Sequence, residues 1–207
     1  DRVQDNRLSK DYFPKKETGE ILLQFKLSAI DMTKGDWLIL ARTNPLLKPI
    51  PRYLKSQGLF FETAQGNSIG KTLFEDIGYW NQMRKGEKIP EIQEQRVLEK
   101  MSKRDDTKEW YDAFDQVALS KKDYLRSMLA NGEDLSKEPR ITIHGAKGGE
   151  ATNVVLFLNQ TKNTMKAAKK SVTKQDEEYR VWYVAVTRTM QKLYLIKCNN
   201  RQKEFNI

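Results

Sequence analysis

The chain has 207 residues, of which 38% are hydrophobic and 31% are charged, so it can bury one good core, or one core and a small appendage. One cysteine, Cys198, excludes an internal disulfide framework, and a single cysteine with a single histidine all but excludes a structural zinc site. No apolar run has the length of a membrane span and the first residues lack a signal-peptide layout, so we expect a cytoplasmic protein.

The net charge of +9 is concentrated toward the C-terminus. From Glu138 onward there are 13 Lys and Arg against 6 Asp and Glu, a net +7, and the rest of the chain has 24 against 22. Clustered positive charge fits a phosphate-backbone partner. A solubilising surface is the alternative, and charge by itself does not separate the two.

The N-terminal half alternates strand and helix. Residues 20–25 predict a strand, and the unbroken apolar run Trp37–Ala41 is typical of a strand buried on both faces of a parallel sheet. A helix is predicted over residues 45–54, Gly58 ends it, and Leu59–Thr63 returns to strand. Strand, helix and strand joined by short links predict an α/β fold with a parallel sheet.

Residues 66–72 (GNSIGKT) resemble a phosphate-binding loop. A Walker A loop would need glycine where Gln65 stands, and the preceding strand is wrongly offset, so its nest of amides would not form. We therefore favour a loop followed by a helix over residues 72–83.

Residues 84–139 are highly charged, with few apolar positions and two helical stretches, Ile89–Met101 and Glu109–Ala130. We interpret residues 84–137 as a helical insertion on an α/β domain made of residues 1–83 and 138–207. Nothing in the insertion indicates its function.

The first stretch that can carry chemistry is a strand at Ile141–Ile143, a glycine-rich turn, and the apolar run Val154–Leu158. The glycines let the backbone approach a ligand closely, where strands of open α/β sheets bind their ligands. The polar residues on the turn are His144, Lys147 and Glu150. Each also has an ordinary explanation, as a surface residue, a solvated charge and a carboxylate near a helix N-terminus.

The second stretch, residues 176–188 (DEEYRVWYVAVTR), predicts a helix that leads into a strand at residues 193–196. Its apolar face is predicted to be Tyr179, Trp182, Tyr183 and Val186. Arg188 lies at the helix end, where an arginine can offset the charge that develops on a transferring phosphoryl group. A surface ion pair is the alternative.

Together these stretches resemble a known family. Residues 142–150 and 177–188 are similar to motifs V and VI of the UvrD/Rep branch of superfamily 1 DNA helicases, and Leu38–Asn44 (LILARTN) resembles their motif IV, in the same order. The resemblance covers residues 36–81 and 138–198. It implies the second RecA-like domain of such a helicase, with the insertion as a reduced accessory subdomain.

For the nucleotide, the resemblance implies that Arg42 and Arg188 contact the γ-phosphate of ATP and that Arg188 is the arginine finger. Glu150 would contact the ribose, and Gly148 would lie beside the nucleotide. Arg180 would support the motif VI helix.

For nucleic acid, the resemblance implies that Thr142, His144 and Lys147 contact the backbone of single-stranded DNA. The sequence departs from the family after this point. Gly149 replaces a usual leucine and Ala151 a usual aromatic residue.

The sequence has no Walker A loop, no Asp-Glu Walker B pair and no motif I glutamine. The resemblance therefore implies that ATP and Mg²⁺ are bound mainly by a first RecA-like domain, in the same polypeptide or a separate chain, and that this chain does not hydrolyse ATP alone. We expect the C-terminal motor domain of an ATP-dependent DNA helicase that translocates on single-stranded DNA and unwinds duplex in repair or replication. The alternative is a non-catalytic nucleic-acid-binding or protein-interaction module of helicase descent.

Overall fold

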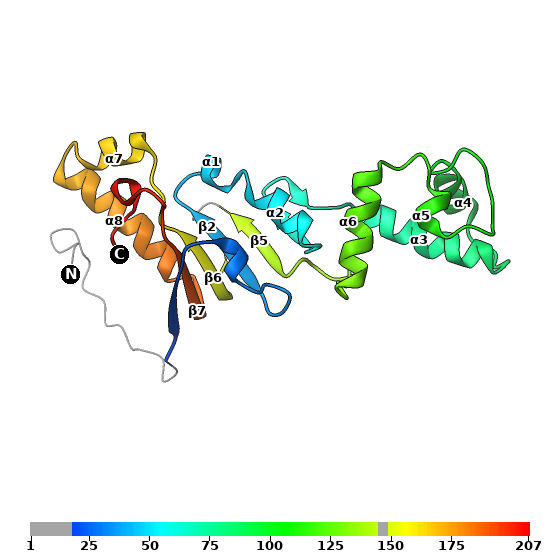
Figure 1. Cartoon of the computed structure of the whole chain (residues 1–207), viewed down its shortest axis with the longest axis horizontal. Coiled ribbons are helices and arrows are strands. Elements are labelled where there is room, and N and C mark those ends of the chain that lie inside the picture. Colours follow the sequence, from blue (N-terminus) through cyan, green and yellow to red (C-terminus); the bar gives the residue numbers. More distant parts are fainter. Residues whose placement is uncertain (1–17, 145–148) are drawn as a thin grey trace. The chain divides into compact units, whose positions relative to one another are not determined.

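A computed structural model describes the backbone of residues 18–144 and 149–207, and the side chains of the same residues except His144 (Figure 1). The chain forms two compact units. The first contains the described residues up to Pro51, together with Glu62–Ala64 and Arg140–Ile207, and the second contains Arg52–Phe61 and Gln65–Pro139.

The described strands form one sheet in the order β1-β7-β6-β2-β5-β3-β4. Their bounds along the sheet are β1 Glu20–Gln24, β7 Thr189–Ile196, β6 Ala151–Phe157, β2 Trp37–Ala41, β5 Ile141–His144, β3 Phe61–Thr63 and β4 Gly66–Asn67. Strand β2 pairs in parallel with β5 and β6, and β6 and β1 each pair in parallel with β7. The predicted α/β fold with a parallel sheet is confirmed.

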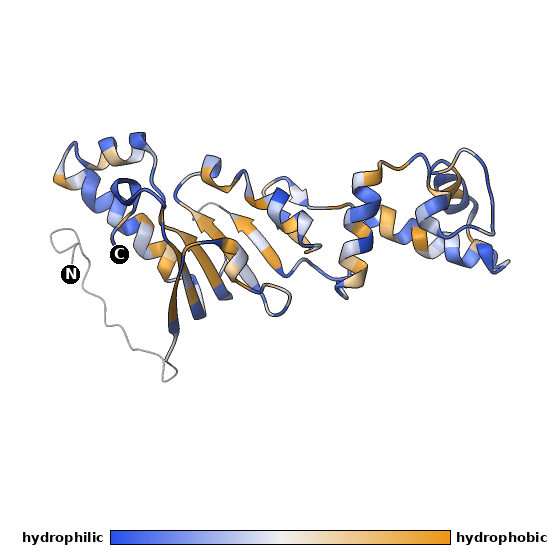
Figure 2. Ribbon diagram, viewed as in Figure 1, coloured by the Kyte–Doolittle hydropathy of each residue, from blue (hydrophilic) through white to orange (hydrophobic). Residues whose placement is uncertain are grey.

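The core lies on both faces of the central strands. All five residues of β2 are buried, as are the consecutive residues Val154–Leu156 of β6, and Figure 2 shows these strands as apolar. One face packs under helix α8 (Val172–Val186), where Trp182 and Ala185 meet leucines and valines of β2, β6 and β7. Each such side chain stabilises the fold by about 1.5–3 kcal/mol. This packing fixes α8 on the sheet.

The other helical segments of the first unit are short. They are η1 Leu27–Ala29, α1 Asn44–Leu47, the start of α2 (Ile50–Ser56), α7 Lys162–Ala168 and η2 Arg201–Lys203. Helix α8 begins before the predicted stretch because the Ser171 side chain caps it by accepting from the Lys174 N–H. The prediction that Tyr183 belongs to the buried apolar face of α8 is wrong, because its side chain is 56% exposed. The buried residues of α8 are Glu178, Trp182 and Ala185.

Strands β5 and β6 lie on either side of β2 and run parallel to it. His144 is level with Leu40, whereas Asn153 is level with Trp37. Ala151, two residues before Asn153, is therefore level with the residue two before Trp37, five positions from Leu40. At about 3.3 Å per residue, His144 and Ala151 are offset by roughly 16 Å along the strands. His144 therefore lies at the C-terminal edge of the sheet, and Glu150 and Ala151 lie at its N-terminal edge.

The second unit contains α3 Lys71–Arg84, α4 Glu91–Leu98, α5 Trp110–Ala113 and α6 Leu119–Ala130. The helix predicted over residues 72–83 is confirmed as α3. The single predicted helix Glu109–Ala130 is wrong, because the chain leaves the helix at Phe114 and the Asp115 carboxylate turns to accept from the Ser102 N–H at 2.7 Å. Helix α4 is shorter than predicted because Pro90 forms its N-cap.

Helix α3 belongs to this second unit. Trp80 is fully buried there, donates its indole N–H to the Lys108 carbonyl at 3.2 Å and packs against Phe114. The compact unit is thus larger than residues 84–137, and the predicted domain bounds stay a prediction. Within residues 18–144 and 149–207, no helix is long and apolar enough to cross a membrane.

Candidate nucleotide and nucleic-acid interface

Arg188 and Glu150 both lie at the N-terminal edge of the sheet. Arg188 follows the C-cap of α8, and its carbonyl accepts from the Ala151 N–H at 3.0 Å. In the sheet, Ala151 is paired with Thr189. The end of α8 is therefore joined through the backbone to the residue after Glu150, whose side chain is exposed.

The guanidinium of Arg188 is not fully satisfied. Its Nε is buried and has no hydrogen-bond partner in the described part of the chain. A buried N–H without a partner costs about 1–3 kcal/mol, which an anionic oxygen at this site would remove. Arg188 is thus suited to accept an anion at this edge.

Asp36 fixes the start of β6, two residues after Glu150. Its carboxylate accepts from the Thr152 N–H at 2.7 Å, and its carbonyl accepts from the backbone and side-chain amides of Asn153 at 3.2 Å. Partial burial by itself would raise the pKa of Asp36, but the hydrogen bonds from Thr152 outweigh it and lower the pKa. Sequence reasoning missed Asp36. The signal that could have found it is its position directly after Gly35, a glycine with φ +81° that lets the chain turn before β2.

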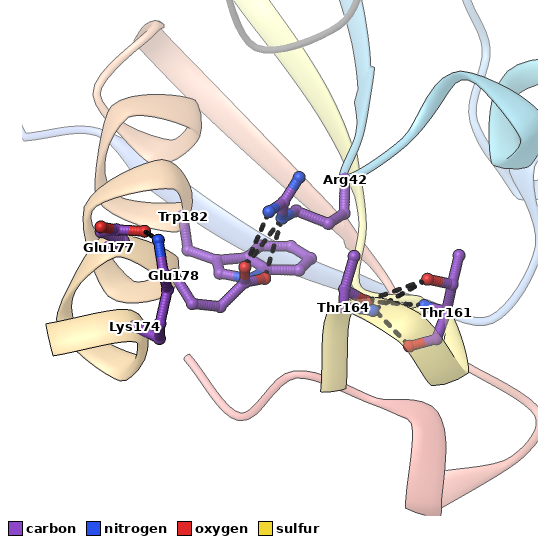
Figure 3. A network of polar contacts seen from close by, with 7 residues as sticks. All are labelled: Arg42, Thr161, Thr164, Lys174, Glu177, Glu178 and Trp182. Carbon is purple, nitrogen blue, oxygen red and sulfur yellow. Dashed lines mark hydrogen bonds and ion pairs between the residues drawn. The ribbon is translucent and has the colours of Figure 1, made fainter. Parts of the chain in front are cut away.

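Arg42 directly follows β2 and is bound by a carboxylate of α8 (Figure 3). Its Nε donates to both oxygens of Glu178 at 2.9 and 3.0 Å, and its Nη2 donates to Oε2 at 2.9 Å. Glu178 is only 5% exposed and also accepts from the indole N–H of Trp182 at 2.8 Å. The pair links the C-terminal end of β2 to the middle of α8.

The structure does not bring Arg42 and Arg188 together. Glu178, which holds Arg42, precedes Arg188 by ten residues, about 15 Å along the helix axis. The geometry therefore does not support a contact of Arg42 with the same γ-phosphate as Arg188. The nucleotide-binding role of Arg42 stays a prediction. Sequence reasoning missed Glu178, whose signal was its i, i+4 spacing from Trp182.

Two of the predicted DNA contacts, Thr142 and His144, belong to strand β5. Thr142 is half-buried in β5 and donates its hydroxyl to the Glu62 carboxylate at 3.0 Å. His144 ends β5, but its side chain lies outside the described residues, as do Lys147 and Gly148 entirely. The structure thus places Thr142 in the first half of β5 and the backbone of His144 at its C-terminal end, and the DNA-binding roles stay predictions.

The two departures from the family pattern fit the structure. A side chain at Gly149 would meet no atom within 4 Å, so glycine there is not required by packing. Ala151 is 6% exposed in the core beneath α8, where it fills a small site. Arg180 is exposed and makes no hydrogen bond or ion pair within the described residues, so its predicted support of the helix is not observed.

Comparison with known proteins shows the family of the chain. The family model of the UvrD-like helicase C-terminal domain matches residues 67–200. A probable DNA helicase II homolog of Mycoplasma capricolum subsp. capricolum is 28% identical over 173 residues, covering 76% of this chain and 24% of that protein. The chain thus spans about a quarter of the length of this relative. Because the family match extends over more than half of the chain, including both chemistry-bearing stretches, the chain belongs to the UvrD-like helicase C-terminal domain family.

Proposed function

We propose that the chain is the second RecA-like motor domain of an ATP-dependent DNA helicase. The observation that carries the proposal is the backbone hydrogen bond from Ala151 to Arg188, which joins Glu150 to an arginine with a buried, unpartnered N–H. A nucleotide held by a first RecA-like domain would meet this edge with its ribose at Glu150 and its γ-phosphate at Arg188.

The chemistry at Arg188 is electrostatic. In phosphoryl transfer the charge spreads over the equatorial oxygens, and an arginine finger that stabilises it raises turnover about 10³–10⁵-fold. In the described part of the chain no group of three or more His, Cys, Asp or Glu could hold a metal ion. By resemblance to the family, we assign Mg²⁺ and most of the phosphate contacts to the first RecA-like domain.

Movement along DNA would result if the proposed DNA contacts and the proposed nucleotide contacts, at opposite edges of the sheet, were coupled. Strand β5 carries the proposed DNA contacts Thr142 and, at its C-terminal end, His144, and Glu150 follows at the opposite edge of the sheet. Closure of the two motor domains on ATP would shift the segment between these edges and change the grip on single-stranded DNA. Release after hydrolysis would restore the first grip.

The test joins this chain to a first RecA-like domain and measures ATP hydrolysis with and without single-stranded DNA. We expect DNA-stimulated turnover in the joined protein, none in the chain alone, and a fall in kcat of about 10³-fold or more for Arg188→Ala. Arg201→Ala, which removes an exposed arginine outside the site, is the control and should leave kcat unchanged.

An Arg188→Ala protein with nearly intact turnover would show that the finger is assigned wrongly. If the joined protein binds single-stranded DNA but hydrolyses no ATP, the non-catalytic nucleic-acid-binding module is the better description.

A further inference from the structure

A group of lysines between β6 and α8 is not used by the proposed motor site. From Asn159 to Gln175 the sequence has five lysines and no Asp or Glu, a net +5 within a chain of net +9. Only Lys174 has an acidic partner in the described residues, Glu177 at 2.7 Å. The other four, named here the lysine ridge, are Lys162, Lys166, Lys169 and Lys170.

The lysine ridge lies on the outer side of α7. The half-buried residues Met165 and Ala168 line a hollow together with Gln175 and Tyr179 of α8, and Lys169 lies at its rim. All four ridge lysines are exposed: Lys162 and Lys166 are one turn apart in α7, and Lys169, its C-cap, and Lys170 follow at its end. Like charges at this spacing repel one another, and a polyanion outside the protein would offset that repulsion.

Helix α7 is held firmly in place. Thr161 caps it through a reciprocal pair of hydrogen bonds, in which the Thr164 N–H donates to Thr161 Oγ1 at 3.1 Å and the Thr161 N–H donates to Thr164 Oγ1 at 3.0 Å (Figure 3). The preceding Gln160 N–H donates to the Lys203 carbonyl at 2.7 Å. Binding of a ligand to the ridge therefore costs little conformational entropy in the backbone of α7.

The position of the ridge relates it to the proposed DNA path. Strand β6 ends at Phe157 and leads into α7, so the ridge follows the C-terminal edge of the sheet. Strand β5, which carries Thr142 and His144, ends at the same edge two strands away, about 10 Å across the sheet. One extended polyanion can contact both.

We propose that the lysine ridge binds the phosphate backbone of the single-stranded nucleic acid that crosses the end of β5. This inference rests on the proposed single-strand grip and adds a second, sequence-independent anchor to it. A membrane surface is the less suitable partner, since the exposed residues within α7 are Lys, Asn and Ala, with no large apolar side chain to enter a bilayer.

The test uses the 207-residue chain and a fluorescent oligo-dT. Lys162→Gln/Lys166→Gln and Lys169→Gln/Lys170→Gln each remove two charges, and glutamine keeps a similar helix propensity. Each pair should weaken binding about tenfold near 0.1 M salt and lower the slope of log K against log salt by about 1.4, since each phosphate contact on a single strand contributes about 0.7. Circular dichroism verifies that the variants are folded.

Lys26→Gln/Lys34→Gln is the matched control, because it removes the same charge from two exposed lysines between β1 and β2. It should change affinity less than twofold. Unchanged affinity and slope in both ridge variants, or an equal loss in the control, would overturn the inference. Binding to phosphatidylglycerol vesicles without binding to oligo-dT would overturn it in favour of a membrane.

The ATPase test of Arg188 separates this inference from the proposed function. If ATP turnover in the joined protein depends on Arg188 but the ridge variants bind DNA normally, only the ridge inference fails. If the ridge variants lose DNA binding but the joined protein hydrolyses no ATP, the ridge stands as a nucleic-acid surface and the motor role fails.

Discussion

Glu178 is a buried carboxylate whose oxygens are all used. Arg42 occupies them with three close N–H contacts and Trp182 with a fourth. Removal of a carboxylate from water is costly, and the two-point geometry of the guanidinium offsets that cost. Removal of one partner therefore costs more free energy of unfolding than the intact pair contributes. The reason is that the remaining partner would be left at least partly buried and unpaired.

Glu178→Ala should lower the free energy of unfolding by about 3 kcal/mol, since it leaves the Arg42 guanidinium half-buried without its partner. Glu177→Ala, next to it in α8, removes an exposed ion pair with Lys174 and should change stability by less than about 0.5 kcal/mol. Urea denaturation followed by far-UV circular dichroism measures both. Equal effects of the two substitutions would show that the buried pair does not hold α8 on β2.

Asp36 gives a pH-dependent contribution to stability. Its pKa is lowered in the folded chain, so its hydrogen bond to the Thr152 N–H is fully present above the unfolded value of 3.8 and is lost as the pH falls through the folded pKa. Asp36→Asn should cost about 1 kcal/mol at pH 7 and progressively less below pH 3.8. Thermal unfolding across this range measures the difference, and a pH-independent cost would contradict the assignment.

At the scale of the elements, Gly58 shows where the chain tolerates no side chain. It has φ +64°, and a Cβ there would lie 2.8 Å from Ser127 Cβ and 2.9 Å from Asn131 Nδ2, both in or beside α6. The Asn131 amide also donates to the carbonyls of Gln57 and Gly58, at 2.7 and 3.0 Å. The turn after α2 and the end of α6 are thus fitted together without room for a methyl group.

Gly58→Ala should destabilise the second unit by about 2 kcal/mol or more, through its left-handed backbone and the clash with α6. Gly78→Ala is the matched control, because Gly78 is exposed in α3 with open space around its Cα and should stabilise the helix by about 0.5–1 kcal/mol. Chemical denaturation of both variants is the measurement. A neutral Gly58→Ala would indicate that the turn moves away from α6.

The sequence predicted these elements better than their arrangement. Apolar runs such as Trp37–Ala41 and the helix that contains Trp182 are local signals, and both are confirmed. The order of strands depends on contacts between distant segments, so the insertion of β2 between β5 and β6 could not be derived from periodicity. For the same reason the pair of Arg42 and Glu178, separated by 136 positions, was missed although both residues lie in recognised motifs.

At the scale of the whole molecule, the sites that we propose for the two ligands lie at different edges of the parallel sheet. Arg188 and Glu150 lie at its N-terminal edge, whereas His144 ends β5 at the C-terminal edge and the lysine ridge follows that edge after β6. Nucleotide and nucleic acid can therefore occupy different edges of one rigid layer. Residues 145–150 join β5 to β6 in the sequence, so we propose that they transmit the state of one ligand to the other.

This separation predicts a double dissociation between His144 and Glu150 in the protein joined to a first RecA-like domain. His144→Ala should weaken oligo-dT binding several-fold and leave ATP hydrolysis without DNA unchanged, because it acts at the C-terminal edge. Glu150→Ala should raise the KM for ATP several-fold, about 1 kcal/mol for a lost ribose hydrogen bond, and leave oligo-dT affinity without nucleotide unchanged. Fluorescence anisotropy and a coupled ATPase assay separate the two effects, whereas variants that each impair both ligands equally would show that the edges do not act separately.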